Sequence, residues 1–261
     1  MDATITYVTK LYNEELHILA RPEIKSIADL ANRKVNIDLR DSSTAITAKR
    51  LFDLIKLTVV PVNDAPDVAL EKLRTGEIAA LAFVAGKPAP LFDHLKGSDG
   101  LHFLALPSSA AVTVGYVPAR LTATDYPRLV PPDHAIDTVA VAAVLVVANL
   151  QQAPDRYRNV ANFVDAFFTG FQSLLEPGHH PKWQEVNLAA EISGWRRYPP
   201  AEQWLQRNLQ VAKAPNPEEL LSMFTRFVDE RRQSTGGTPM TQQEKQDLFQ
   251  QYRRWETGQT Q

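Results

Sequence analysis

The sequence contains no cysteine. This absence excludes disulfide bridges, thiolate nucleophiles and cysteine-ligated zinc or iron–sulfur centres, and it fits the cytoplasm and the periplasm equally well. An excess of one charge is also lacking, because 28 basic and 30 acidic residues leave a net charge of −2. No global positive field attracts nucleic acid or an anionic membrane surface. We therefore expect small-molecule or protein partners and no nucleic-acid partner.

Long apolar runs are missing as well. The longest uncharged apolar stretch is Thr138–Leu150, which is shorter than the roughly 20 residues that a membrane-spanning helix needs. We predict a buried strand there and no direct membrane insertion. The first residues have neither the basic start nor the apolar core of a signal peptide, so the chain as given is not predicted to be a secretion precursor.

Catalytic and metal-binding motifs are absent too. The sequence has no G-x-S-x-G, P-loop, G-x-G-x-x-G or H-E-x-x-H pattern, and we expect neither an enzyme nor a cofactor. His179 and His180 are adjacent, so their side chains point apart, and no third ligand follows at a recognised spacing. We predict a solvated loop from His179 to Trp183 and no metal site.

What the sequence does contain is an alternation of strand and helix patterns in its first half. Predicted strands alternate with predicted helices, each pair separated by a short polar or glycine-containing turn: strands at Leu16–Ala20, Lys34–Asp38, Thr58–Val62 and Ile78–Val84, and helices at Ala45–Ile55 and Asp67–Thr75. This order predicts an α/β fold with a parallel or mixed sheet and helices on both faces. Such sheets bind ligands at the carboxyl ends of their strands.

The pattern changes near residue 150, where helical periodicity takes over. We expect residues 1–147 to form the α/β lobe and residues 148–232 to form a helical part. Residues 233–261 are expected to form a flexible linker, 233–239, followed by an amphipathic helix over Thr241–Glu256. The apolar stripe of that helix predicts docking onto the chain's own body or onto a partner.

The strongest site candidate is Asp41-Ser42-Ser43-Thr44, between a predicted strand and a predicted helix. A helix start leaves backbone N–H groups unpaired and carries partial positive charge, so it can hold a carboxylate or phosphate, with the hydroxyls of Ser42 and Thr44 as additional donors. The alternative is that these residues only cap the helix. Asp41 argues against an anion, because its own carboxylate could fill the place.

The passage Leu11–Ile55 resembles the TAXI family of solute receptors, which serve TRAP-type transporters. The residues that match the family pattern are Tyr12, Glu15, Ser26, Asp29, Leu30, Ser42, Thr44 and Ala45, together with the loop Phe83–Pro88. The resemblance implies a two-lobed fold of the type 2 periplasmic-binding-protein kind, an extracytoplasmic location and a membrane transporter as partner.

The chain also departs from the family pattern. Asp38, Asp41 and Ser43 stand where the family has a glycine-rich turn, and Asn13 stands where proline is usual. The aspartate side chains are expected to crowd a backbone approach to ligand. A Gly-Gly-Thr-Tyr-Tyr-like segment of the family has no counterpart before Leu11, so we expect the chain to lack most of one lobe's sheet.

The resemblance places Tyr12 and Glu15 near the hinge between the lobes, where Glu15 would hold a ligand ammonium while the helix start holds a carboxylate. Phe83 and Gly86 would line the cleft as an apolar wall and a point of close backbone approach. The alternatives are that Glu15 is an ordinary exposed acidic residue and that Phe83 belongs to the core. We therefore predict a receptor for a small carboxylate, such as an amino acid or dicarboxylate, or else a sensor or interaction domain without a transport role.

Overall fold

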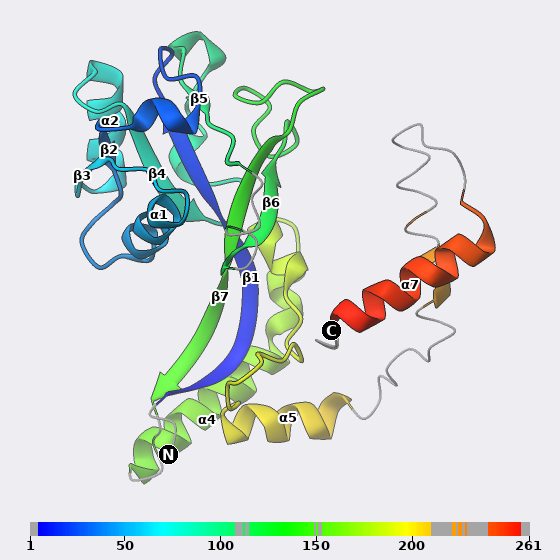
Figure 1. The fold of residues 1–261 in the computed structure, drawn as a ribbon. Helices are drawn as coiled ribbons and strands as arrows, with labels where there is room; N and C mark the ends of the chain where they lie inside the picture. Colours follow the sequence, from blue (N-terminus) through cyan, green and yellow to red (C-terminus); the bar gives the residue numbers. More distant parts are fainter. Residues whose placement is uncertain are drawn as a thin grey trace. The chain divides into compact units, whose positions relative to one another are not determined.

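The computed structural model shows a mixed α/β protein (Figure 1). It describes residues 5–107, 112, 115–148, 150, 153–209, 221, 222, 224, 225, 228 and 240–256. The chain divides into two compact units, residues 1–201 and residues 202–261. The lobe boundaries near residues 147 and 232 stay predictions.

The strands are β1 Ile5–Ala20, β2 Lys34–Asn36, β3 Val60–Val62, β4 Ala80–Ala85, β5 His102–Phe103, β6 Val117–Leu121 and β7 Ile136–Ala148. The α-helices are α1 Ser43–Leu54, α2 Pro66–Thr75, α4 Pro154–Thr169, α5 Pro199–Leu209 and α7 Gln242–Glu256. Short 3₁₀ helices are η1 Ile27–Leu30, η2 Pro90–Phe92, η3 Gly97–Asp99, η4 Phe171–Leu175 and η5 Pro181–Glu185.

The seven strands of the described residues form one sheet in the order β3-β2-β4-β1-β7-β6, with β5 also paired to β1. The β3-β2-β4 part is parallel, and the strands around β1 and β7 pair antiparallel. Strand β1 is long enough to join two regions: its first part pairs with β7, and its last part pairs with β4 (Figure 1). At Glu15 the strand is flanked by Ala85 of β4 and Ala140 of β7.

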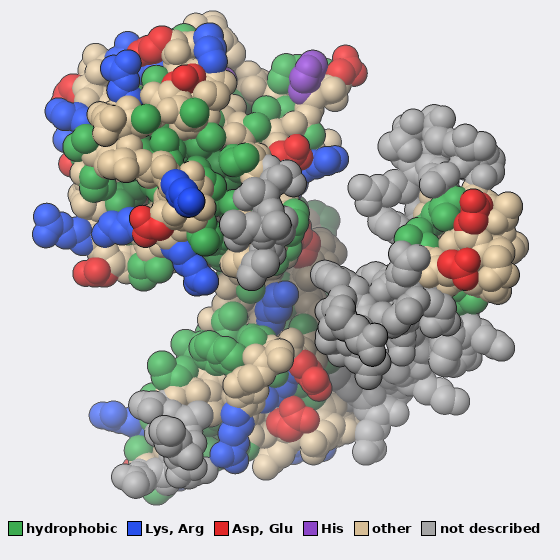
Figure 2. All heavy atoms as spheres, viewed as in Figure 1, with side chains coloured by type: hydrophobic (Ala, Val, Ile, Leu, Met, Phe, Trp, Pro, Cys, Tyr) green, Lys and Arg blue, Asp and Glu red, His purple; other side chains and the backbone are tan. Residues whose placement is uncertain are grey.

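The core lies on both faces of this sheet because successive side chains of a strand point to opposite sides. Leu16 and Ile18 of β1 pack in one cluster with Ala48 and Leu51 of α1. Leu19 lies in a second cluster, which also contains residues of α2 and η2. Helices therefore cover both faces, and the predicted α/β class is confirmed. On the surface seen in Figure 2, basic and acidic side chains are interspersed.

The apolar run predicted as a buried strand forms β7, but most of it is not buried. Thr138, Val139 and Ala140 are buried, whereas Val146 is 46% exposed. The reason is that β6 pairs only with the first residues of β7, so the later residues have β1 alone as a paired strand. In the part of the chain that the structure describes, no helix is both long and apolar enough to cross a membrane.

The helices after residue 150 follow the sequence pattern less closely. The helical part predicted from residue 148 onward is not continuous, because η5 ends at Glu185 and α5 begins only at Pro199. In the second unit, Thr241 and Glu244 cap the start of α7 reciprocally, with Thr241 N–H donating to the Glu244 carboxylate over 2.8 Å. Phe249 of α7 packs against Phe224 of the same unit, with ring centroids 5.3 Å apart. The predicted linker 233–239 lies outside the described residues.

Candidate functional site

The helix-start segment Asp41–Thr44 forms the beginning of α1, as the sequence predicts. The Ser42 hydroxyl accepts a hydrogen bond from Ala45 N–H over 3.0 Å, so Ser42 is the N-cap of the helix. Among the described residues, no group accepts from the backbone N–H groups of Ser43 and Thr44. Capping and two unpaired donors therefore coexist here, and the anion-binding role stays a prediction.

The turn before the helix explains how aspartates replace the glycines of a glycine-rich turn. Asp38 has a φ of 66° and Asp41 a φ of 65°, a left-handed conformation that aspartate tolerates better than most residues. The Asp38 carboxylate accepts from Leu39 N–H over 2.7 Å, and Asp41 is exposed. No hydrogen bond joins the Asp41 carboxylate to the helix start among the described residues.

Thr44 fixes the helix start against the end of β4. Its side chain is buried, and its hydroxyl accepts a hydrogen bond from Val84 N–H over 3.1 Å. Strand β2 pairs with β4 only near Ala80 and Leu81, so Thr44 satisfies a backbone donor that β2 does not reach. The hydroxyl proton of Thr44 stays available for donation to a ligand.

Glu15 is buried rather than exposed, so the interpretation of Glu15 as an ordinary surface carboxylate is wrong. Its side chain is 4% exposed and forms an ion pair with Lys182, with 2.5 Å between Oε1 and Nζ. The other carboxylate oxygen accepts from Lys87 N–H over 3.1 Å. Lys182 also pairs with Glu185 over 2.9 Å. Glu15 therefore already holds an ammonium group, and that group comes from the chain itself.

The predicted solvated loop from His179 to Trp183 is wrong at its centre. Lys182 is 2% exposed and packs in η5 against β1. His180 Nε2–H donates to the Pro88 carbonyl over 3.1 Å, while its Nδ1 accepts from Lys182 N–H. Burial lowers the pKa of Lys182, but the hydrogen bonds and charges of Glu15 and Glu185 outweigh it, and the net pKa is raised. Lys182 therefore stays charged.

Tyr12 and Gly86 meet at the same place. The Tyr12 ring stacks on His180, with centroids 6.4 Å apart, and contacts Trp183 edge-on at 5.5 Å. A Cβ atom added to Gly86 would lie 2.9 Å from Lys182 Cγ and 3.4 Å from Tyr12 Cε2. Gly86 therefore permits a close approach of these side chains to the backbone, and the approach of a ligand at Gly86 stays a prediction. We call Tyr12, Glu15, Gly86, His180 and Lys182 the crossing cluster.

Of the two environments predicted for Phe83, the cleft wall and the core, the structure shows the core. It is half-buried and packs edge-on against Phe92, with ring centroids 6.1 Å apart. Its carbonyl accepts from His17 Nδ1, and His17 Nε2 accepts from the Tyr126 hydroxyl over 2.6 Å, which in turn accepts from Ala89 N–H. Complete burial lowers the pKa of His17 to about 4, so the ring is neutral.

The structure brings the helix-start segment and the crossing cluster to neighbouring residues near the end of β4, on opposite faces of the sheet. The helix-start segment reaches Val84 through Thr44, and the crossing cluster reaches Ala85 and Gly86 through Glu15 and its neighbours. Lys182 and His180 were missed as site residues, because nothing in their local pattern signals partners 167 and 92 positions away, respectively. Among the described residues, no three histidine or acidic side chains are grouped so that they could hold a metal ion.

Solved structures of solute-binding proteins are similar to this chain at low sequence identity. An ancestral arginine-binding protein bound to glutamine is 12% identical, with 69% of this chain and 62% of that chain covered and a TM-score of 0.37. A TctC solute-binding protein from Polaromonas is 11% identical, with 70% and 58% covered and a TM-score of 0.38. The periplasmic sulfonate-binding protein SsuA from Methylobacillus flagellatus KT is 15% identical, with 67% and 46% covered and a TM-score of 0.39. The chain spans less than two thirds of each of these proteins.

The match to a protein family extends well beyond the candidate site. The model of the NMT1-like family matches residues 2–163, which include β1 to β7, the helix-start segment and much of the crossing cluster. Membership of the TAXI family is a narrower statement, and it stays a prediction. The chain belongs to the NMT1-like family.

Proposed function

We propose that this chain is a solute-binding protein or domain that captures a small carboxylate for a TRAP-type transporter, at an extracytoplasmic location. Capture rather than chemical conversion is the proposed role. The family assignment supports a binding protein, and the resemblance of Leu11–Ile55 to TAXI receptors supports the transporter class.

One observation carries the proposal: two unpaired backbone N–H groups and two hydroxyls lie at the end of β4, beside the long strand that links two regions. Ser43 and Thr44 supply the amides, and Ser42 and Thr44 supply the hydroxyls. A carboxylate held there would gain charge-assisted hydrogen bonds and the favourable end of the helix dipole. The carboxyl ends of strands are also where α/β sheets bind ligands.

The crossing cluster narrows the class of carboxylate. Because Lys182 already neutralises Glu15, a ligand ammonium would have to displace a buried ion pair, which is unfavourable. A dicarboxylate has no ammonium group and so makes no such demand. We therefore favour a dicarboxylate over an amino acid, within the proposed class of small carboxylates.

Ligand-induced stabilisation tests the proposal. A ligand that binds only the folded state raises its stability by about 2.7 kcal/mol at 100 times its Kd. We expect succinate or a related dicarboxylate to raise the melting temperature more than the amino acids alanine and arginine do. If no dicarboxylate and no amino acid raises the melting temperature, the proposal is contradicted. That result favours the alternative, a sensor or interaction domain that binds no small carboxylate.

The helix-start variant locates the binding. Ser42→Ala combined with Thr44→Ala should weaken the bound carboxylate by about 1–3 kcal/mol, since it loses charge-assisted partners. Thr58→Ala is the matched control, because Thr58 is exposed and precedes β3. Unchanged affinity in the double variant, with the fold intact, would reassign Ser42 and Thr44 to capping and packing alone.

A further inference from the structure

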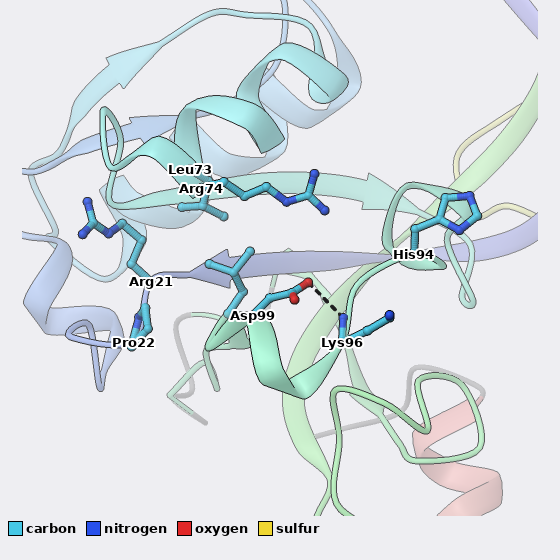
Figure 3. A pocket seen from close by; sticks show the side chains of 8 residues that line it. Arg21, Pro22, Leu73, Arg74, His94, Lys96 and Asp99 are labelled. Atoms are coloured by element: carbon cyan, nitrogen blue, oxygen red, sulfur yellow. Dashed lines mark hydrogen bonds between the residues drawn. The ribbon is translucent and has the colours of Figure 1, made fainter.

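A cavity, which we call the basic pocket, lies apart from the candidate site. It has a volume of about 630 Å³, and Figure 3 shows the residues that line it. They come from the end of β1, the last turn of α2 and the segment around η2 and η3: Arg21, Pro22, Leu73, Arg74, His94, Lys96, Asp99 and Leu101. Volumes of 300–1,000 Å³ are typical of small-molecule sites.

The basic pocket lies at the C-terminal end of β1, whereas the crossing cluster contacts the middle of the strand. Arg21 directly follows the last residue of the strand, Ala20. Since each strand residue advances about 3.3 Å, Arg21 is roughly 20 Å from Glu15 along the chain. A ligand in the basic pocket therefore does not contact Glu15 or Lys182, and the two sites can be tested separately.

The lining is strongly cationic. Arg21, Arg74 and Lys96 carry permanent positive charges, and Asp99 is the one carboxylate among the lining residues. In Figure 3 the Arg74 side chain extends across the middle of the view, His94 and Lys96 lie on one side of it, and Arg21 lies at the other end. Cations from separate elements around one cavity suit a ligand with several anionic oxygens.

These cations are only weakly engaged within the chain. Among the described residues, the Lys96 ammonium and the His94 ring have neither an ion pair nor a hydrogen-bond partner. Arg21 pairs with Glu23 over 2.9 Å, and the two side chains are 32% and 55% exposed. Arg74 pairs with Glu71 over 2.6 Å, and these are 38% and 67% exposed. Such exposed pairs contribute about 0–1 kcal/mol, so a polyvalent anion can replace them.

Two details show how the chain accommodates these basic side chains: the space beside Arg21 and the orientation of Asp99. Gly76, at a φ of 86°, lies against the Arg21 guanidinium, and an added Cβ would come within 2.2 Å of its Nη1. The Asp99 carboxylate is turned toward the backbone, where it accepts from Lys96 N–H over 3.1 Å. Its negative charge still disfavours an anion in the pocket, so a variant that removes this charge should bind the anion more tightly.

We propose that the basic pocket binds a small phosphate-type anion, either free inorganic phosphate or the phosphoryl group of a small organic molecule. Arg74 and Lys96 hold its oxygens, with Arg21 at the far end. Guanidinium groups bind phosphate through paired N–H donors. This site is independent of the carboxylate site at the end of β4.

Titration calorimetry with inorganic phosphate, pyrophosphate and glycerol 3-phosphate tests the proposal. We expect at least one of them to bind, and Arg74→Gln combined with Lys96→Gln to weaken it tenfold or more. Asp99→Asn should tighten binding several-fold. Stronger binding of glycerol 3-phosphate than of phosphate identifies an organic ligand, and the reverse order identifies the free anion.

The control variant is Lys49→Gln, which removes an exposed charge from α1, on the other face of the sheet. It should leave phosphate affinity unchanged. Equal weakening by Lys49→Gln and by the pocket variants overturns the proposal, because it shows non-specific attraction. Absence of binding by all three probes overturns it as well. Loss of phosphate binding in Ser42→Ala/Thr44→Ala would move the anion to the helix start and overturn the proposal too.

Discussion

Glu15 and Lys182 form a buried ion pair that joins the middle of β1 to η5, with 2.5 Å between Oε1 and Nζ. Both side chains are at most 4% exposed. Because β1 at Glu15 is flanked by β4 and β7, the pair ties the segment after α4 to the strand that links two regions. When the part of β1 that pairs with β7 moves against the part that pairs with β4, this ion pair is either kept or broken.

Removing one partner should therefore destabilise the chain severely. Lys182→Met leaves a buried carboxylate without its counter-charge, and breaking a buried pair in this way costs about 3–5 kcal/mol. The double variant Glu15→Gln/Lys182→Met should recover much of this loss, because the uncharged amide that replaces the carboxylate still offers an oxygen to Lys87 N–H. Chemical denaturation of the wild type, the two single variants and the double variant measures the coupling energy.

The pair Lys72–Asp64 serves as the comparison. Its partners are 2.8 Å apart but 33% and 25% exposed. Lys72→Met should lower the free energy of unfolding much less than Lys182→Met does, because solvent screens an exposed pair. Equal losses for Lys72→Met and Lys182→Met would show that the Glu15–Lys182 pair is not energetically special.

Gly86 tests how tightly the crossing cluster is packed. An added Cβ would lie 2.9 Å from Lys182 Cγ, an atom in the middle of a buried side chain. Gly86→Ala should cost about 1–3 kcal/mol of unfolding free energy, as overpacking does. Gly115→Ala is the matched change, since the nearest atom to its Cβ would be 3.8 Å away. If thermal unfolding ranks the two variants equally, the cluster adapts more readily than its distances indicate.

Elements with a local signal could be predicted from the sequence. The alternating apolar residues of Lys34–Asp38 and the polar residues before Ala45 predict strand, turn and helix, and the structure forms β2 and α1 there. The helix start was found for the same reason, since capping residues act within a few positions of each other. Tyr12, Glu15 and Gly86 came from the family resemblance instead.

Features that depend on distant partners could not be predicted. The sequence pattern places Lys182 in a loop because lysine is almost never buried without a partner, and its partner Glu15 lies far away in the sequence. The partial exposure of β7 was missed for a similar reason. Its apolar run has no alternation, so the pattern does not show where the pairing with β6 stops.

Because His17 is buried, we expect the stability of the folded chain to depend on pH. Burial lowers its pKa from 6.5 to about 4, and the neutral ring donates to Phe83 and accepts from Tyr126. Between these two values the unfolded chain binds more protons than the folded chain. Stability is therefore complete above the unfolded pKa and is lost as the pH falls from about 6.5 toward 4, by about 3 kcal/mol at 1.36 kcal/mol per pKa unit.

The measurement compares the wild type with His17→Gln, which cannot titrate in this range. Urea denaturation between pH 4 and pH 7.5 should give a steeper loss of stability toward low pH in the wild type than in the variant. The difference between the two curves isolates His17 from Glu14, whose pKa is raised by burial and then by the charge of Glu15, so that its contribution has the opposite sign. Parallel curves would mean that His17 is protonated as easily in the folded chain as in the unfolded one, against its buried hydrogen bonds.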